Sequence, residues 1–455
     1  MAAAEADRLQ HFRVDPERLD TAADAVIETM TAAYPDLDVP YHARWRHFVI
    51  AGTDRWQVLA AASPNMDPAE RARVRFDLAV TSVLLDAGAG DAWRYRDSLT
   101  DTTLVRSEGL ALASLDMFAA GAFSSDKDAP LRADAPALGA VTEEALAAGF
   151  QVGGNNPLVG LAGRAGLLRA LGAALAERPD LFGDTAPRVG NLFDALAKRA
   201  RDGVVTAEQV LAAVLDGFGS IWPGRESLAG INLGDVWRHP EARGEDMTDG
   251  LVPFHKLSQW LTYSLFEPLE EAGIRVTGVD ALTGLAEYRN GGLLVDTGFL
   301  VPKHAGVTRD AHGPGETVIV EWRALTVVGL DRVAEAVRRK LGLDSWQLPL
   351  AKVLEGGTWQ AGRRAAADPV GERRNRLLGR ALMNGRVECE GRTSSAIVVT
   401  SDISQPTTHV ADVPSADIGE RSSGLRMEPG WDCRKTEDRF HAALYADDAD
   451  GIVAN

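Results

Sequence analysis

The sequence contains little cysteine and no long hydrophobic run, and both absences exclude classes of protein. Only two cysteines, Cys389 and Cys433, occur in 455 residues, so we expect no disulfide scaffold and a cytoplasmic location. No apolar segment is long enough to span a bilayer, and the N-terminal stretch MAAAEADRLQHFRVD lacks the apolar core of a signal peptide. We therefore expect no membrane partner.

Positive charge is also in short supply. The chain has 48 lysines and arginines against 65 aspartates and glutamates, which gives a net charge of -17 and a pI near 5.0. Because binding to a phosphate backbone needs a basic surface, we expect no nucleic-acid partner. A local basic pocket for one small phosphate is still compatible with this balance.

The common cofactor motifs are missing as well. Neither GxGxxG nor a P-loop occurs, so a dinucleotide fold and a nucleoside-triphosphate site are not supported. No CxxC or HExxH occurs, and the nine histidines are scattered over the chain. Asp235 and His239 would lie one turn apart on a helix and, with His255, give a weak metal signal. We expect no metal and no other cofactor.

What the sequence does contain is apolar residues at helical spacing, within a composition that is 45% hydrophobic. Asn156-Pro157 predicts a helix start, and the apolar residues of 161–175 follow until Pro179 ends the run. Thr206 and Gln209 predict a capping box ahead of another apolar face. Pro253 predicts the start of a further helix. Residues 317–341 continue the pattern, although their β-branched start, TVIVEW, is ambiguous.

These patterns predict a mainly α fold. We expect one large helical body over residues 10–365, made of an N-terminal helical part (10–150) and a core that carries the site motifs (151–365). The composition changes after about Arg364, where helical patterning fades and both cysteines occur. We therefore expect residues 366–455 to form a poorly packed or disordered tail.

The stretch ALTGLAEYRNGGLLVDTG (281–298) is the best candidate for a β-hairpin. Asn290-Gly291 is a strong two-residue turn signal, and the alternation that follows would put Glu287, Arg289 and Asp296 on one face of the ribbon. Glu287 and Asp296 would then be diagonal neighbours. This face is either a solvated surface with a weak ion pair or the place where the chemistry occurs.

Eight segments have an unusual composition that distinguishes them from the rest of the chain. They are YHARWRHF (41–48), LLDAGAGDAWRYR (84–96), SIWPGR (220–225), LGDVWRHP (233–240), LVPFHKLSQWLTYSLFEPLEEAGI (251–274), LTGLAEYRNGGLLVD (282–296), VEWRALTVVGLDRV (320–333) and LPLAKVLEGGTWQAGR (348–363). Together they resemble a family named for uracil catabolism, the fourth protein of that gene set. The resemblance implies a pathway in which uracil becomes a nucleotide, its ring is opened, and urea is released.

A second, more distant resemblance concerns two of these segments. LTGLAEYR and VEWRALTVVGLDRV look like the ADYR and EIRA-T segments of queuosine salvage proteins. Those are helical enzymes, related in architecture to DNA glycosylases, that cut the N-glycosidic bond of a modified nucleotide. The resemblance therefore implies a DNA-glycosylase-like fold, and it places Glu287 at the position of the catalytic carboxylate. Glutamate in place of aspartate extends that carboxylate by one methylene.

N-glycosidic cleavage builds positive charge on the sugar, which a positioned carboxylate stabilises while it activates water. Glu287, Asp296 and Glu321 are the predicted catalytic carboxylates. Tyr288 and Arg289, beside Glu287, and Arg323, beside Glu321, are predicted to bind the substrate. The alternative for the Glu321–Arg323 pair is a surface ion pair within one helix.

A substrate phosphate needs cationic donors, for which Arg238, His239, His255 and Lys256 are the candidates. Trp260 is predicted to stack on a base or urea group. The alternative for each histidine is a satisfied structural residue, and for Trp260 a place in the core.

The sequence thus predicts a hydrolase that cleaves the N-glycosidic bond of a ring-opened pyrimidine nucleotide, resembling a ribosylurea phosphate, and releases urea and a pentose phosphate. Its expected partner is this small nucleotide or ribosyl phosphate, and no oligomeric state is predicted. Two alternatives stay open. One is an amide hydrolase that trims the opened pyrimidine, and the other is a non-catalytic protein that binds the pathway's nucleotide.

Overall fold

Helices build the protein, as the mainly α prediction requires. The computed structural model describes residues 1–90, 92–222, 226–310 and 312–367. One large cluster of buried apolar side chains extends from Ala4 to Ala361 and joins nearly all of the elements. The predicted division at residue 150 and the likeness to DNA glycosylases stay predictions. The predicted tail lies outside the described residues, apart from the last turn of the final helix.

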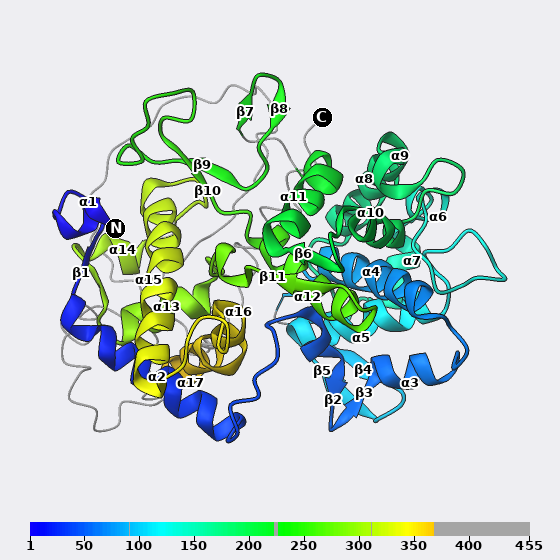
Figure 1. Cartoon of the computed structure of the whole chain (residues 1–455), viewed down its shortest axis with the longest axis horizontal. Helices are drawn as coiled ribbons and strands as arrows, with labels where there is room; N and C mark the ends of the chain where they lie inside the picture. The colour runs from blue at the N-terminus through cyan, green and yellow to red at the C-terminus, as the bar shows by residue number, and fades with distance from the viewer. Residues whose placement is uncertain (91, 223–225, 311, 368–455) are drawn as a thin grey trace, which may run out of the picture.

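One end of the molecule is formed by residues that follow the first fifty (Figure 1). Its helices are α3 (Arg55–Ala61), α4 (Pro68–Leu84), α5 (Arg106–Ala119), α6 (Ala135–Gly139), α7 (Glu143–Gly149), α8 (Leu161–Glu177), α9 (Pro179–Phe182) and α10 (Leu192–Arg199). Helix α4 packs against α5, α8, α10 and α12, so it is enclosed over most of its length.

The other end combines the N-terminal residues with the last helices (Figure 1). Its elements are α1 (Ala2–Glu5), β1 (Phe12–Val14), α2 (Leu19–Ala33), α13 (Tyr288–Asp296), β12 (Leu300–Pro302), α14 (Gly306–Arg309), α15 (Thr317–Leu341), α16 (Leu350–Val353), a π-helical turn (Leu354–Thr358) and α17 (Trp359–Ala367). Helices α11 (Ala207–Phe218) and α12 (Lys256–Glu271) lie between the two ends.

The strands are short and occur in pairs. Antiparallel pairs are β1–β12, β2 (Val49–Ile50) with β3 (Thr53–Asp54), β4 (Tyr95–Asp97) with β5 (Thr102–Leu104), β7 (Ser227–Leu228) with β8 (Ile231–Asn232), and β9 (Val236–Arg238) with β10 (Leu251–Pro253). The pair β6 (Val204–Thr206) and β11 (Arg275–Thr277) is parallel. Short 3-10 turns cover 16–18, 44–48, 189–191, 219–221 and 279–281.

Several predicted helix boundaries can be compared with the structure. The capping box of Thr206 and Gln209 is confirmed, and so is a continuous helix over 317–341, including its β-branched start. The helix expected after Asn156-Pro157 begins only at Leu161, after Gly160 in a left-handed conformation. Pro253 was expected to open a helix, but it ends β10 instead, and α12 begins at Lys256.

The hairpin predicted over 281–298 is wrong, because residues 288–296 of this stretch form helix α13 and its remaining residues form no strand. Gly291, which was expected in the turn, lies in the helix against α15. A Cβ atom there would lie 2.8 Å from the Thr326 hydroxyl and closer still to the ring of Trp322. Gly362 of α17 packs in the same way on the backbone oxygen of Arg289. These glycines therefore allow α13 to pack closely against α15 and α17. This packing outweighs the local preference of Asn290-Gly291 for a turn.

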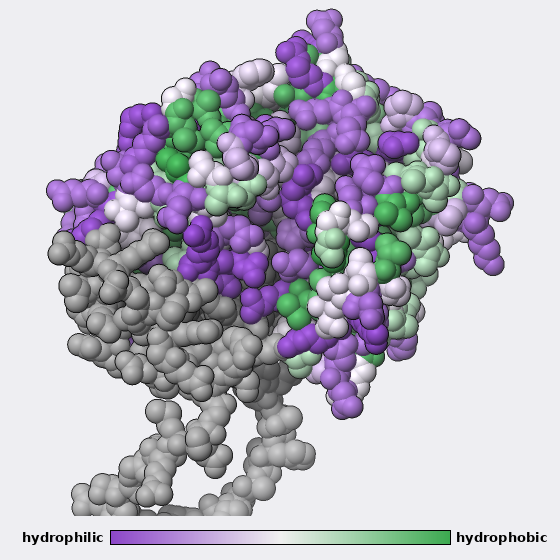
Figure 2. All heavy atoms as spheres, turned by 90° about the horizontal axis from the view of Figure 1, so that it is seen from below, coloured by the Kyte–Doolittle hydropathy of each residue, from purple (hydrophilic) through white to green (hydrophobic). Residues whose placement is uncertain are grey.

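No helix in the described part of the chain is long and apolar enough to cross a membrane. The face shown in Figure 2 is mainly hydrophilic, and its hydrophobic residues form separate patches.

Candidate functional site

Glu287 begins helix α13 and is the centre of the candidate site. Its Oε1 accepts the backbone N–H of Asn290 at 2.6 Å, and its Oε2 accepts that of Arg289 at 3.0 Å, so the carboxylate caps the helix. Glu287 is only 5% exposed. Burial raises the pKa of its carboxyl, while the two backbone N–H groups and the charge of Lys256 oppose that rise. The result is a buried carboxylate whose ionised form is favoured by the charge of Lys256.

Lys256 is the first residue of α12 and is buried. Its backbone N–H donates to Asp235 Oδ2 at 3.1 Å. The residue before it, His255, has a left-handed conformation with φ 44°, which turns the chain from β10 into α12. Burial lowers the pKa of His255, and the charge of Asp235 opposes that effect. Two predicted substrate-binding residues, His255 and Lys256, are therefore held in place by one buried aspartate.

That aspartate forms a bidentate ion pair with Arg323. The Arg323 Nη1 and Nη2 atoms donate to Asp235 Oδ1 and Oδ2 at 2.9 and 2.8 Å, and the indole N–H of Trp237 donates to Oδ1 at 2.8 Å. Burial alone would raise the pKa of Asp235, but the Arg323 charge and these hydrogen bonds outweigh it and hold the pKa well below its usual range. The Arg323 guanidinium also lies 4.1 Å from the centre of the Phe254 ring.

Glu321 shares helix α15 with Arg323 but has different partners. Its carboxylate accepts three backbone N–H groups of the N-terminal segment, from Gln10 at 3.2 Å, His11 at 2.9 Å and Phe12 at 2.6 Å. His239 Nε2 lies 3.4 Å from Glu321 Oε2. The alternative, a surface ion pair within one helix, is wrong, because both residues are buried and have different partners. The catalytic role predicted for Glu321 stays a prediction.

The remaining predicted residues are distributed along α13 and β9. Asp296 ends α13, so the helical rise places it about 13 Å from Glu287 along the axis and the expected diagonal contact is wrong. The Arg289 guanidinium lies 4.5 Å from the centre of the Tyr288 ring, and both residues are buried. The Arg238 side chain is 59% exposed and pairs with Glu226.

The helical spacing assumed for Asp235 and His239 is also wrong, because the residues between them form strand β9. His239 Nδ1 accepts the backbone N–H of Glu241 at 3.1 Å. Within the described residues, no group of three or more histidine, cysteine or acidic side chains could hold a metal ion.

Among the buried side-chain atoms that have no hydrogen-bond partner within the described residues, three lie on α12, α13 and the π-helical turn. They are Trp260 Nε1 on α12, Asn290 Oδ1 on α13, and Thr358 Oγ1 in the π-helical turn. The Asn290 amide is oriented by its Nδ2, which donates to the Leu285 oxygen at 3.1 Å and leaves Oδ1 as the open acceptor. Buried polar atoms are nearly always paired in proteins, so these three atoms are candidates for contact with a water, an ion or a ligand. Asn290 is not among the predicted site residues, because the sequence assigns it to a hairpin turn and not to the first turn of a helix.

Trp260 lies in an aromatic and cationic environment. Its ring centre is 5.6 Å from the Arg44 guanidinium and 5.7 Å from the ring of His47. It is one helical turn beyond Lys256, on the same face of α12. Trp260 is only 4% exposed, so it offers no open stacking surface.

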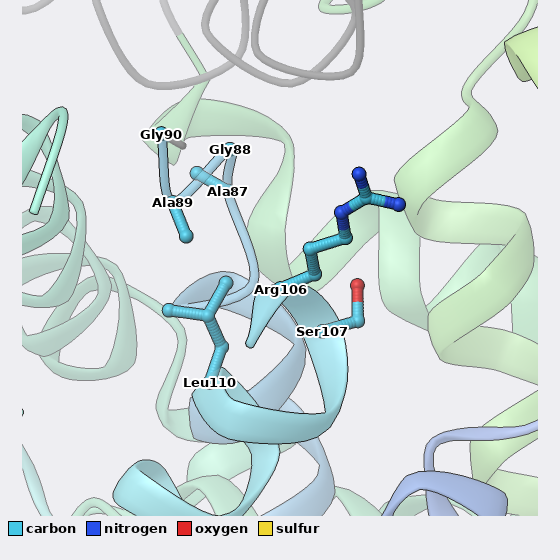
Figure 3. A pocket seen from close by; sticks show the side chains of 7 residues that line it. All are labelled: Ala87, Gly88, Ala89, Gly90, Arg106, Ser107 and Leu110. Carbon is cyan, nitrogen blue, oxygen red and sulfur yellow. The ribbon is translucent and has the colours of Figure 1, made fainter. Parts of the chain in front are cut away.

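A pocket lies beside this region, between a glycine-rich loop and the start of α5 (Figure 3). Its lining is Ala87, Gly88, Ala89, Gly90, Arg106, Ser107 and Leu110. Ser107 donates to Asp86 Oδ1 at 3.0 Å, and Asp86 pairs with the buried Arg44 that contacts Trp260. Figure 3 shows the Arg106 guanidinium extending away from the loop. Four of these residues lie in the LLDAGAGDAWRYR segment, which was distinguished by its composition but was not predicted to form a pocket.

Arg164 fixes the shape of that loop. Its guanidinium donates to the backbone oxygens of Leu85 at 3.0 Å and Ala87 at 2.8 Å. Gly90 has a positive φ of 78° and packs against Val159, where a side chain would collide. The backbone of the pocket is therefore held by a buried arginine.

Comparison with known proteins shows where this chain belongs. A family model described as a protein of unknown function (DUF1688) matches residues 1–375. The chain belongs to this family. Protein urg3 of Schizosaccharomyces pombe is 40% identical over 367 residues, covering 79% of this chain and 88% of the relative. Uracil catabolism protein 4 of Lachancea kluyveri is 38% identical over 388 residues, covering 78% and 88%. The resemblance drawn from the eight segments is thereby confirmed.

Proposed function

We propose that this protein acts in uracil catabolism as a hydrolase, cleaving the N-glycosidic bond of a ring-opened pyrimidine nucleotide to release urea and a pentose phosphate. The name of one relative, uracil catabolism protein 4, supports the pathway. The observation that carries the chemistry is the buried Glu287 carboxylate at the start of α13, with the Lys256 charge acting on it.

The proposed reaction uses the carboxylate in two ways. As the bond between the anomeric carbon and nitrogen breaks, positive charge develops on the sugar, and the Glu287 carboxylate stabilises it. A water oxygen then bonds to the anomeric carbon and loses a proton to the carboxylate. Glu287 passes that proton to the departing nitrogen, so that urea leaves neutral and the carboxylate returns to its ionised form. Each Glu287 oxygen accepts one backbone N–H and keeps a second lone pair for this work. Lys256 favours the ionised form that the reaction needs.

The unpaired atoms support a ureido leaving group. Urea offers N–H donors and one carbonyl acceptor. Asn290 Oδ1 is an open acceptor within the first turn of α13, and Trp260 Nε1 is an open donor one turn beyond Lys256. The polarity of the two atoms matches the two ends of such a group.

The test is to incubate the purified protein with N-ribosylurea 5′-phosphate and to analyse the products by mass spectrometry. Release of both urea and pentose phosphate is the expected result. Release of ammonia with the sugar still attached would indicate the amide hydrolase instead, and loss of that activity with a chelator would strengthen this alternative. Binding without turnover would indicate the non-catalytic protein.

A further inference from the structure

Histidines gather where the N-terminal segment meets the rest of the protein, away from Glu287. His11 Nδ1 and His304 Nε2 are 2.9 Å apart and share a hydrogen bond. Their ring centres are 5.2 Å apart, in an edge-on arrangement. His239 and His312 are near enough for their charges to act on His11. Four of the nine histidines of the chain therefore influence one another here.

The same place holds the N-terminal arm, which we define as residues 1–14. Glu321 binds the backbone N–H groups of Gln10, His11 and Phe12, and β1 then pairs with β12. Lys303 donates to the Leu9 oxygen at 2.6 Å. These hydrogen bonds and the buried side chains of Leu9 and Phe12 attach the arm, and His11 lies between those two residues in the hydrogen-bonded run.

The His11–His304 bond needs at least one neutral ring. One nitrogen donates its proton and the other accepts it, so the bond forms only while one facing nitrogen is unprotonated. When both facing nitrogens carry protons, two N–H groups oppose each other across 2.9 Å and the bond is lost. Two positive rings also repel each other.

Other charged groups face this pair from every element around it. The pKa of His11 is lowered, because burial, which has the largest effect, and the charges of His304, His312 and His239 outweigh the opposing charge of Glu321 on α15. Glu316 also interacts electrostatically with His11. Lys303 adds a further positive charge from the end of β12. His312 is bonded to Glu316 at 2.9 Å, which offsets part of its own charge.

We propose that the His11–His304 pair makes attachment of the N-terminal arm sensitive to acid, so that a second proton loosens the arm and uncovers Glu321. The sign follows from the charges. A histidine whose pKa in the folded protein is below the reference of 6.5 stabilises the attached arm above that pH, and this contribution is lost as the pH falls below it.

Hydrogen exchange of the Gln10, His11 and Phe12 amides tests this proposal in the full chain. Protection factors should fall by roughly fivefold between about pH 7.5 and about pH 5.5, the change that corresponds to one lost hydrogen bond. Protection of the central helix α12 should stay constant over the same range. His304→Gln keeps a group that can bond to His11 but does not titrate, so most of the acid response should disappear.

Two further variants keep the test decisive. His11→Gln should lose the acid response in the same way, whereas His42→Gln should keep it, because His42 pairs with Glu355 elsewhere. Constant protection in the parent, or an acid response in His304→Gln equal to that of the parent, would overturn the proposal. An arm already open at neutral pH in both His304→Gln and His11→Gln would also overturn it, since the pair would then be a structural bond only.

Discussion

Glu287 and Glu321 are both buried carboxylates that accept backbone N–H groups, yet their partners come from different distances along the chain. Glu287 binds residues two and three positions ahead, at the start of its own helix. Glu321 binds residues that are about 310 positions away. Glu287 also has the buried Lys256 acting on it and open polar atoms nearby, whereas Glu321 has three backbone donors and His239.

Under the proposed function, the first carboxylate serves the chemistry, whereas the second joins distant parts of the fold. A cap on a local helix leaves the carboxylate free to respond to a bound substrate. A carboxylate that joins the N-terminal arm to α15 is occupied by the fold itself. The following substitutions test this comparison.

Glu287→Gln should produce the largest effect. Removing the negative charge should lower turnover of the ribosylurea phosphate by roughly 10²–10⁴-fold, the range for a positioned acid–base group. Ground-state binding should change little, because the opposing charge exists only near the transition state. Turnover and binding are measured by product mass spectrometry and calorimetry.

The matched control for Glu287→Gln is Asp134→Asn. Asp134 is also a buried acidic N-cap, at the start of α6, and accepts the Ala137 N–H at 3.0 Å. Both variants should lose about 1 kcal/mol of unfolding free energy through the weakened cap. Equal turnover in the two variants would mean that Glu287 is a cap and nothing more.

Glu321→Gln should mainly affect stability. Its amide group places a donor against donors of the arm, so the free energy of unfolding should fall by about 2–4 kcal/mol. Glu335→Gln, on the exposed face of the same helix, should change it by less than about 0.5 kcal/mol. Denaturant unfolding measures both. If folded Glu321→Gln loses as much turnover as Glu287→Gln, the assignment of roles is wrong and Glu321 takes part in the reaction. The same test applies to Asp296, through Asp296→Asn.

Two adjacent glycines test the packing that positions Glu287. Gly291→Ala should lower the unfolding free energy by about 1–3 kcal/mol, because the added methyl meets Trp322 and Thr326. Gly292→Ala should raise it by up to about 1 kcal/mol, because its Cβ meets no atom and alanine favours a helix. Thermal unfolding separates the two. Equal changes in unfolding free energy for the two variants would contradict a helix at Gly291 and Gly292 and would favour a turn there.

The smallest expected effect is in the pH dependence of stability. Burial raises the pKa of Glu287 above its reference of 4.5. A raised pKa stabilises the fold fully below 4.5 and loses that contribution as the pH rises through the folded value. The stability of the parent relative to Glu287→Gln should therefore be greater at about pH 4.5 than at neutral pH. A difference that grows toward neutral pH would contradict the raised pKa.

Local signals in the sequence determined much of the helical framework. The capping box of Thr206 and Gln209 and the periodic run of 317–341 depend on contacts between near neighbours, which a single chain segment already specifies. The unusual segments around Glu287 and Arg323 also identified the family and the region of the candidate site.

Only the tertiary structure decided the conformation of 288–296 and the partners of the charged residues. Asn290-Gly291 favours a turn locally, but the approach of α15 and α17 needs small residues inside a helix, and this packing prevailed. Asp235 and Arg323 are 88 positions apart, and Glu321 reaches the N-terminal arm across more than 300. A single sequence does not reveal such pairs. The partner is selected by burial and by distance in space, and the spacing of two residues along the chain indicates neither.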